Sequence, residues 1–386
     1  MVHLSERELE LPDAVIAKLI KMAVEDRSII SLGPGEPDMN TFKPIIKYTK
    51  RFAKKCNHYS PPGGRLELKE GIIKKLKKDN KINAGVENII VTSGSQEALL
   101  LAAACSCDVS EEIIVPSPSY MGYISAIELL NINPVLLELK RSNKFEVNPD
   151  ELKKIIDKKR TKAIILNSPA NPTGSIIRRN ILEEIADIAV DNDVYIFSDE
   201  AYEKITYNKK FVSIGSLNGM HNHVVTLHSF SKTYAMCGYR LGYAVGPRKL
   251  IDAMTMSHVY STIAAPTISQ LVGAKALEIK QKYIDKMVET YRKRRDLIVR
   301  RLNEMDMDTI MPDGAFYAFS GIRNFDKKSS RFAANLLKNA KVAVVPGVEF
   351  GRYGEGNIRC SYATDIKLIE EAMYRIEKLL KHSKST

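Results

Sequence analysis

The stretch from Ala163 to Tyr202 reads AIILNSPANPTGSIIRRNILEEIADIAVDNDVYIFSDEAY. It holds two short apolar runs, Ala163–Asn167 and Val194–Ser198, and between them residues 178–191 carry apolar side chains at helical spacing. Nearly continuous β-branched runs are typical of strands buried on both faces, and strands that alternate with helices are typical of a parallel sheet. This stretch therefore predicts a strand, helix and strand of an α/β fold.

The same pattern recurs on both sides of this stretch. It predicts one large, mainly parallel, seven-stranded sheet whose apolar runs begin at Asn88, Glu112, Pro134, Ala163, Val194, Val224 and Arg240. Flanking helices are predicted over Ser95–Ser106, Asn148–Lys159, Arg178–Asp191 and Arg248–Ser257.

The pattern changes after residue 275, where a long charged helix is predicted over Lys275–Met305. We expect a large domain over residues 46–280 and a smaller α+β domain over residues 281–386. Residues 1–45 are expected to pack with the smaller domain, because their central loop has too little core of its own. The smaller domain is predicted to contain strands near Gly314 and Val342 and a closing helix, Asp365–Leu380.

Composition excludes several classes of protein. A chain of 386 residues with 44% hydrophobic and 27% charged residues can bury real cores, so it is neither a peptide, a coiled coil nor a disordered tail. The formal net charge of +12 does not by itself choose among nucleic acid, an acidic substrate and a basic background. The basic runs fall at predicted helix ends without interleaved aromatic residues, so no nucleic-acid partner is expected.

The sequence also indicates the cellular compartment and argues against a membrane helix or a metal site. No basic segment followed by an apolar core opens the chain, and the longest uncharged run, Ala253–Ala274, is interrupted by polar residues, so neither secretion nor a membrane helix is expected. Five scattered cysteines favour reduced thiols, and we expect a cytoplasmic protein. Neither Cys105 and Cys107 nor His221 and His223 form a convincing metal site, so no metal is expected.

Polar residues follow the ends of several predicted strands. Asn171 follows the fourth run, Asp199 the fifth and Lys232 the sixth, and Arg240 stands eight positions after Lys232. Ligands of open α/β sheets bind at the carboxyl ends of the strands, so we expect these residues on one rim. A lysine with a lowered pKa can form a Schiff base with an aldehyde, and a carboxylate can pair with a protonated ring nitrogen. Pyridoxal 5'-phosphate requires both.

Four motifs occur in order along the chain: Asn171-Pro-Thr-Gly, Ser198-Asp-Glu-Ala-Tyr, Ser229-Phe-Ser-Lys-Thr-Tyr-Ala-Met-Cys-Gly-Tyr-Arg-Leu-Gly and Ile358-Arg-Cys-Ser-Tyr-Ala. Together with Ser31-Leu-Gly-Pro-Gly-Glu-Pro-Asp, they resemble the class I and II aminotransferases of pyridoxal phosphate fold type I over essentially the whole chain. The resemblance implies transfer of an amino group from aspartate, an aromatic amino acid or a broad range of donors to a 2-oxo acid such as 2-oxoglutarate, by a ping-pong mechanism.

The resemblance also implies roles for residues that bind the cofactor. Lys232 would form the Schiff base and move a proton between Cα and C4′, Asp199 would hold the pyridine nitrogen, and Tyr202 would donate to the cofactor oxygen O3′. The phosphate would be bound by Gly94, Ser95, Gln96, Ser229 and Arg240. The amides of Ser95 and Gln96 open a predicted helix, and on its own this feature is more often an ordinary helix start than a phosphate site.

Further roles concern the substrate and a second subunit. Tyr120 would stack on the pyridine ring and border the substrate, and Arg359 would take the substrate α-carboxylate with Asn171 and Gly35. Asn171 would also contact the cofactor. Tyr59 resembles the tyrosine that reaches the phosphate of a neighbouring subunit, which implies a homodimer.

Other interpretations stay open from the sequence alone. The same residues could serve a carbon–sulfur lyase or an aminocyclopropane carboxylate synthase, since the same cofactor chemistry permits elimination or ring closure. A non-catalytic regulator is disfavoured by Lys232 and by the lack of a recognisable DNA-binding domain. A hydrolase with a Ser229–Lys232 dyad leaves Asp199 without a role. Gln96 stands where aspartate-selective relatives often carry lysine, which weakens the case for strict dicarboxylate preference.

Overall fold

A seven-stranded sheet forms the centre of the larger lobe in this computed structural model, which describes residue 22 and residues 25–383. Its strand order is β2-β8-β7-β6-β5-β3-β4, and only β8 runs antiparallel to its neighbours. All seven predicted strands are present. Their bounds are β2 Ile89–Thr92, β3 Glu112–Ser117, β4 Asn133–Glu138, β5 Thr161–Asn167, β6 Tyr195–Asp199, β7 Val224–Ser229 and β8 Gly242–Val245.

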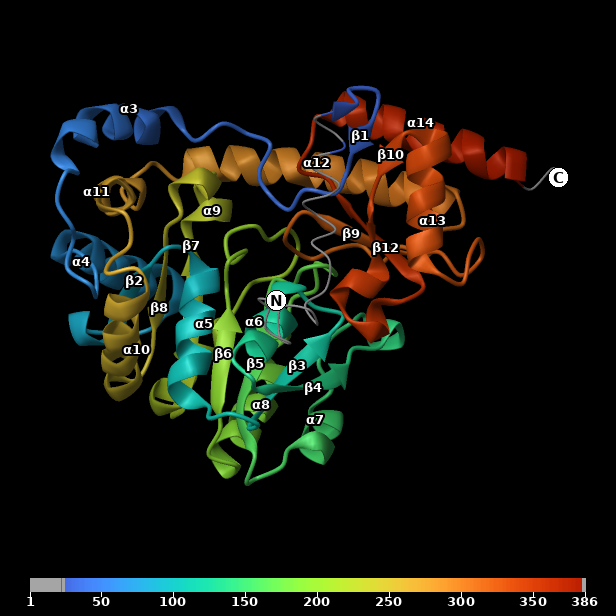
Figure 1. The fold of residues 1–386 in the computed structure, drawn as a ribbon. Coiled ribbons are helices and arrows are strands. Elements are labelled where there is room, and N and C mark those ends of the chain that lie inside the picture. Colours follow the sequence, from blue (N-terminus) through green and yellow to red (C-terminus); the bar gives the residue numbers. More distant parts are fainter. Residues whose placement is uncertain (1–21, 23–24, 384–386) are drawn as a thin grey trace, which may run out of the picture.

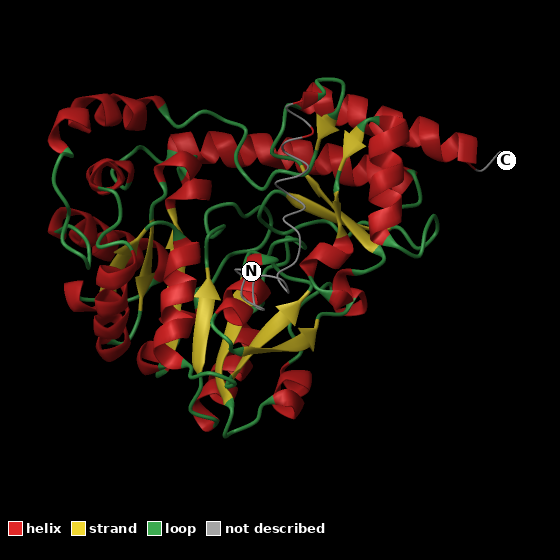
Figure 2. Ribbon diagram, viewed as in Figure 1, coloured by secondary structure: helices red, strands yellow, loops and turns green. Residues whose placement is uncertain are grey.

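Helices cover both faces of this sheet (Figures 1 and 2). Along β5, Ile164 and Leu166 pack in one core cluster and Ala163 and Ile165 in another. Both sets of alternating side chains are thus buried, which explains the uninterrupted apolar run. One cluster is shared with α7 (Pro149–Ile155) and α8 (Arg179–Asp191), the other with α5 (Ser95–Ser106), α6 (Gly122–Leu129) and α10 (Arg248–Ser261).

The smaller lobe is built around a three-stranded antiparallel sheet in the order β11-β12-β9, covered by helices. The long helix α12 runs from the neighbourhood of α9 to this lobe (Figure 1). The bounds are α11 Thr267–Ala276, α12 Lys282–Glu304, β9 Tyr317–Gly321, α13 Ser329–Asn335, β11 Val345–Pro346, β12 Asn357–Ser361 and α14 Ile366–Ser383. The remaining helices are α3 Lys43–Phe52, α4 Leu66–Lys75 and α9 Phe230–Thr233.

The N-terminal part of the described chain reaches the smaller lobe through β1 (Ile30–Ser31), which pairs in parallel with β10 (Val342–Ala343). The domain boundaries at 45 and 280 stay predictions, and residues 1–21 and 23–24 of the N-terminal segment lie outside the described residues.

Several predicted elements were wrong in extent. The predicted helix Lys275–Met305 is two helices, because α11 ends at Ala276 and the chain turns before α12. The strand expected near Gly314 begins only at Tyr317, since Ala315 has a φ of 55° and breaks extended structure. The strand expected near Val342 is split into β10 and β11, which belong to different sheets.

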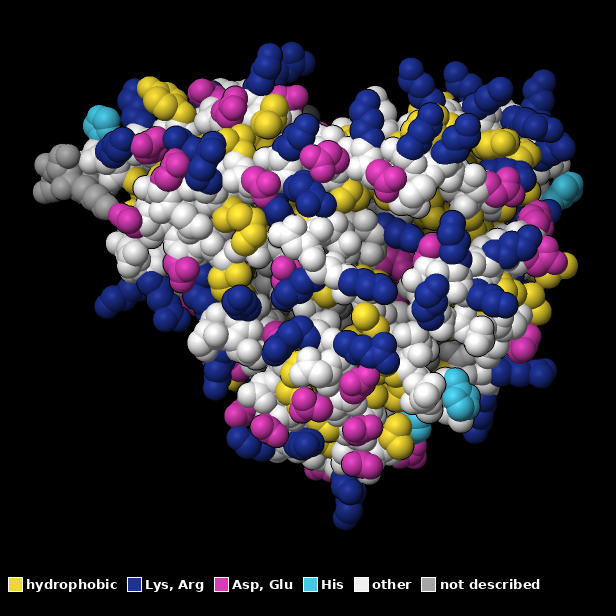
Figure 3. Space-filling model, turned by 180° about the vertical axis from the view of Figure 1, so that it is seen from behind, with side chains coloured by type: hydrophobic (Ala, Val, Ile, Leu, Met, Phe, Trp, Pro, Cys, Tyr) yellow, Lys and Arg dark blue, Asp and Glu magenta, His cyan; other side chains and the backbone are white. Residues whose placement is uncertain are grey.

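The surface shows charges of both signs. On the face seen in Figure 3, Lys and Arg side chains are interspersed with Asp and Glu over both lobes. Across the described residues, every helix is either too short or too polar to traverse a bilayer.

Candidate functional site

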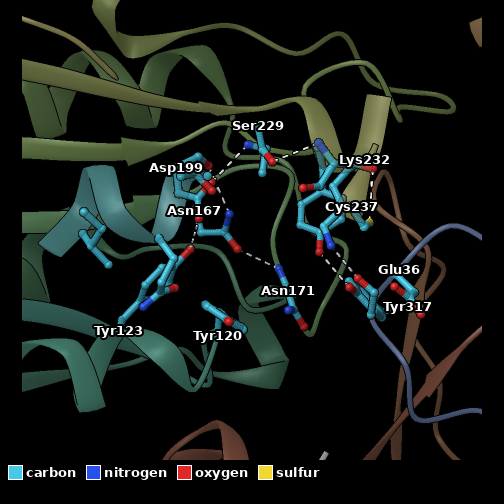
Figure 4. A pocket seen from close by; sticks show the side chains of 18 of the residues that line it. Glu36, Tyr120, Tyr123, Asn167, Asn171, Asp199, Ser229, Lys232, Cys237 and Tyr317 are labelled. Carbon is cyan, nitrogen blue, oxygen red and sulfur yellow. Dashed lines mark hydrogen bonds between the residues drawn. The ribbon is translucent and has the colours of Figure 1, made fainter. Parts of the chain in front are cut away.

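A cavity of about 350 Å³ lies at the carboxyl ends of β5, β6 and β7, and its lining comes from both lobes. Twelve of the thirteen residues predicted for the site line it: Gly35, Gly94, Ser95, Gln96, Tyr120, Asn171, Asp199, Tyr202, Ser229, Lys232, Arg240 and Arg359. Figure 4 shows side chains of this lining converging on one space. The thirteenth, Tyr59, lies outside the cavity with 79% of its surface exposed.

Lys232 is held at the cavity by the short helix α9. The Ser229 hydroxyl caps this helix by accepting from the amide of Ser231 at 3.1 Å, so the end of β7 turns sharply and carries Lys232 into the cavity. The Lys232 ammonium donates to the carbonyl of Gly35 at 2.6 Å. Burial lowers the pKa of Lys232 because a desolvated ammonium is less stable than the neutral amine.

Asp199, the last residue of β6, presents its carboxylate to the same cavity. Oδ2 accepts from the Tyr123 hydroxyl at 2.6 Å and Oδ1 accepts from the Ala201 amide at 3.0 Å. Burial raises the pKa of Asp199, although these two hydrogen bonds act in the opposite direction. A half-buried carboxylate that faces the cavity is suited to bind a protonated ring nitrogen.

One end of the cavity is suited to an anion. The helix α5 begins at Ser95, and the first amides of a helix have no partner within it. Gly94 has a φ of 104°, and a Cβ there would come within 2.7 Å of Arg240 Nη2, so the turn accepts only glycine without movement. Arg240 is fixed by carbonyls, with Nη1 donating to Cys237 at 3.0 Å and Nη2 to Ser93 at 3.3 Å. A phosphate suits such a helix N-terminus beside a guanidinium.

The other end holds a buried guanidinium without a counter-charge. Arg359 on β12 is 1% exposed, and it donates through Nη1 to Asn171 Oδ1 at 2.9 Å and through Nη2 to the Gly33 carbonyl at 2.5 Å. Its Nε has no hydrogen-bond partner, and no carboxylate of the described residues forms an ion pair with it. The guanidinium lies 4.5 Å from the ring centroid of Tyr317 and 4.9 Å from that of Phe350. A buried, unneutralised cation of this kind favours binding of a carboxylate.

Sequence reasoning missed several cavity residues. Tyr123 and Asn167 could have been predicted from the sequence, since Tyr123 follows Tyr120 by three positions and Asn167 ends a strand at the predicted rim. Tyr317 could not, because it comes from the smaller lobe without a motif of its own. The remaining unpredicted lining residues include Pro34, Glu36, Leu99, Ala201, Ser231 and Cys237.

A second buried polar group lies behind Asp199, outside the cavity. Ligand-type atoms of Glu200, Glu203 and His228 lie within 4.8 Å of one another, an arrangement that the sequence did not predict. The ammonium of Lys75 contacts Glu203 and also donates to Asn80 Oδ1 at 2.7 Å. An internal cation therefore already supplies the positive charge that these carboxylates need, and we assign no metal to the group.

Comparison with known proteins gives a consistent result. The model of the family "Aminotransferase class I and II" matches residues 27–376. The chain is 43% identical to "Aspartate aminotransferase" of Pyrococcus abyssi, with 96% of each chain covered, and 41% identical to "Aromatic-amino-acid aminotransferase 2" of Thermococcus litoralis, with 99% of each covered. Its structure is similar to that of an aromatic aminotransferase from Pyrococcus horikoshii, with a TM-score of 0.91 and 40% identity over 96% of this chain and 100% of that one.

Proposed function

The chain belongs to the class I and II aminotransferases, and we propose that it uses pyridoxal 5'-phosphate to move an amino group from an aromatic amino acid or aspartate to a 2-oxo acid. The observation that carries this proposal is one cavity that holds both Lys232, an amine with a lowered pKa, and Arg359, a buried guanidinium without a counter-charge. The first can bind an aldehyde and the second a carboxylate.

The residues present fit this cofactor. Gly94 leaves room at the start of α5 that a Cβ would fill, beside Arg240 and Ser229, which suits a phosphate. Asp199 would hold the proton of the pyridine nitrogen, Tyr202 would donate to O3′ and Tyr120 would stack on the ring. When bound, the cofactor supplies an electron sink for the bond that breaks at the substrate Cα.

The chain's own residues perform the remaining steps of the proposed reaction. Arg359 holds the substrate carboxylate as a fork, with Asn171 already in place on Nη1. Lys232, whose pKa is lowered by burial, moves the proton at Cα as a base. After the donor has given up its amino group and left as a 2-oxo acid, a second 2-oxo acid enters the same site as the acceptor. One carboxylate-binding residue therefore serves both partners.

The lining favours donors with uncharged side chains. The cations that line the cavity are Lys232, Arg240 and Arg359, and each has a role in the proposal. Gln96 donates to the carbonyl of Gly122 at 3.1 Å, and Glu36 adds a negative charge. Within the described part of this chain, no further cavity cation awaits a second carboxylate. We therefore rank aromatic donors above aspartate, the donor in the name of the Pyrococcus abyssi relative.

We also propose a cytoplasmic homodimer in which Tyr59 reaches the partner's site. The segment around Tyr59 is tied to the start of α11, since the Thr267 hydroxyl donates to the His58 carbonyl at 2.7 Å. Tyr59 and Tyr260 are 79% and 84% exposed, which supports an interface because large aromatic side chains are costly to leave in water. All five cysteines are free, in keeping with a reducing compartment.

The test is a visible absorption spectrum of the purified protein with pyridoxal phosphate, before and after single amino acids are added without a 2-oxo acid. We expect a yellow band that aromatic donors bleach faster than aspartate does. Faster bleaching by aspartate would reverse the ranking of donors. Release of pyruvate and ammonia from cystathionine would instead indicate a lyase, and a protein that stays colourless with pyridoxal phosphate would contradict the proposal.

A further inference from the structure

Tyr317 lines the cavity and contacts both Arg359 and Tyr202. It is the first residue of β9, is fully buried, and shares the three-stranded sheet with Arg359 on β12. Its ring lies 4.5 Å from the Arg359 guanidinium, a favourable contact between a cation and an aromatic face. Figure 4 shows it among the lining side chains.

The hydroxyl of Tyr317 is tightly placed. It lies 2.7 Å from the hydroxyl of Tyr202, which comes from the larger lobe. A Cβ added at Gly35 would come within 2.7 Å of the same oxygen, so backbone closes its other side. Among the described residues, Tyr202 is its one hydrogen-bond partner.

We propose that Tyr317 is a positioning residue whose hydroxyl donates to Tyr202 Oη and thereby leaves the Tyr202 proton directed into the cavity. Each phenol has one proton, so the direction of this hydrogen bond decides whether Tyr202 can donate to anything else. The inference rests on the proposed function, in which Tyr202 donates to the cofactor oxygen O3′.

The short distance between the two oxygens and the proposed role of Tyr202 together support this direction. The hydroxyls lie 2.7 Å apart and both tyrosines line the cavity, so one hydroxyl donates to the other. Because the proposed function commits the Tyr202 proton to the cofactor oxygen, Tyr317 supplies the proton of the hydrogen bond between them.

The consequence is measurable in the cofactor-loaded enzyme. A hydroxyl that accepts a hydrogen bond becomes a stronger donor, so Tyr317 would strengthen the bond from Tyr202 to O3′. Loss of the hydrogen bond from Tyr202 destabilises the anionic form of the cofactor oxygen O3′. The bound cofactor then keeps its proton to a higher pH.

The experiment is a pH titration of the visible band in four enzymes: wild type, Tyr202→Phe, Tyr317→Phe and the double variant. Tyr202→Phe should raise the midpoint by roughly one pH unit or more. Tyr317→Phe should raise it by about 0.2 to 0.5 unit. The double variant should match Tyr202→Phe alone, because Tyr317 acts through Tyr202. Phe keeps the ring beneath Arg359, so the half-saturating donor concentration should stay near that of wild type.

Tyr207→Phe is the matched control, because its hydroxyl also makes a buried hydrogen bond, to the Ala315 carbonyl at 2.6 Å, but does not line the cavity. It should leave the titration unchanged. A Tyr317→Phe midpoint that is unchanged or lower, or an effect that adds to that of Tyr202→Phe, would overturn the inference alone. A wild-type protein without a visible band would overturn the proposed function as well.

Discussion

Replacement of Arg359 by lysine separates recognition of the substrate from binding of the cofactor. The guanidinium is 1% exposed and can offer a carboxylate two parallel hydrogen bonds, whereas an ammonium is a point charge that replaces at most one of them. A hydrogen bond to a charged group contributes about 1.5 to 3 kcal/mol, which corresponds to roughly a 10- to 150-fold loss in kcat/KM for the amino donor.

The assay measures single-donor bleaching and steady-state turnover, with the visible spectrum as the measure of cofactor content. The spectrum should be retained, because the proposal gives Arg359 a role in binding the substrate and none in binding the cofactor.

The matched control is Arg295→Lys. Arg295 is 4% exposed, donates to the Pro312 carbonyl at 3.1 Å and lies 4.4 Å from the ring centroid of Tyr207, but it does not line the cavity. Both variants should lower the unfolding temperature, whereas Arg295→Lys should keep the wild-type kcat/KM. Wild-type catalysis in Arg359→Lys, or an equal loss in Arg295→Lys, would refute the assignment of Arg359.

Three further predictions follow from the geometry. Lys232→Ala should abolish the yellow band and reduce turnover by several orders of magnitude, as measured by absorbance and steady-state rates; near-wild-type turnover would remove Lys232 from the chemistry. Gly94→Ala should weaken cofactor affinity at least tenfold in a titration of the apoenzyme, because its Cβ would meet Arg240 at 2.7 Å and its φ is 104°; an unchanged affinity would place the phosphate elsewhere. Burial raises the pKa of Glu200 from 4.5 to about 8, so the folded state keeps the proton that the unfolded chain releases, and the contribution of Glu200 to stability should fall as pH rises from about 5 to 8, against the opposite contribution of His228, whose pKa burial lowers. Glu200→Gln should flatten that fall in thermal melts, and an equally steep fall in the variant would contradict this pKa.

The sequence was sufficient to predict residues that line the cavity from strand ends. Asp199, Lys232 and Asn171 follow long buried strands, and strand burial leaves a strong apolar signal. The predicted sheet was therefore correct in strand number, and twelve of thirteen site residues line one cavity.

The failures also have a physical reason. Strands β1, β10 and β11 are two residues long, too short to show any period, so their pairing depends on distant partners. Tyr317 joins the site through such tertiary packing, since its hydroxyl contacts Tyr202, 115 positions away in the chain. Tyr59 is 79% exposed and does not line the cavity of its own chain, so its predicted role depends on a second subunit.

The pairing of β1 with β10 has a consequence for synthesis of the protein. Arg359 and Gly33, which are joined by a hydrogen bond, stand 326 positions apart in the chain. A growing polypeptide can form the larger sheet while the ribosome is still translating the last strands, but the segment from β1 to Gly35 has no strand to pair with until β10 and β12 emerge. The lining of the cavity is therefore completed only when translation is almost finished, and a chain that stops short of β12 would hold Lys232 without Arg359.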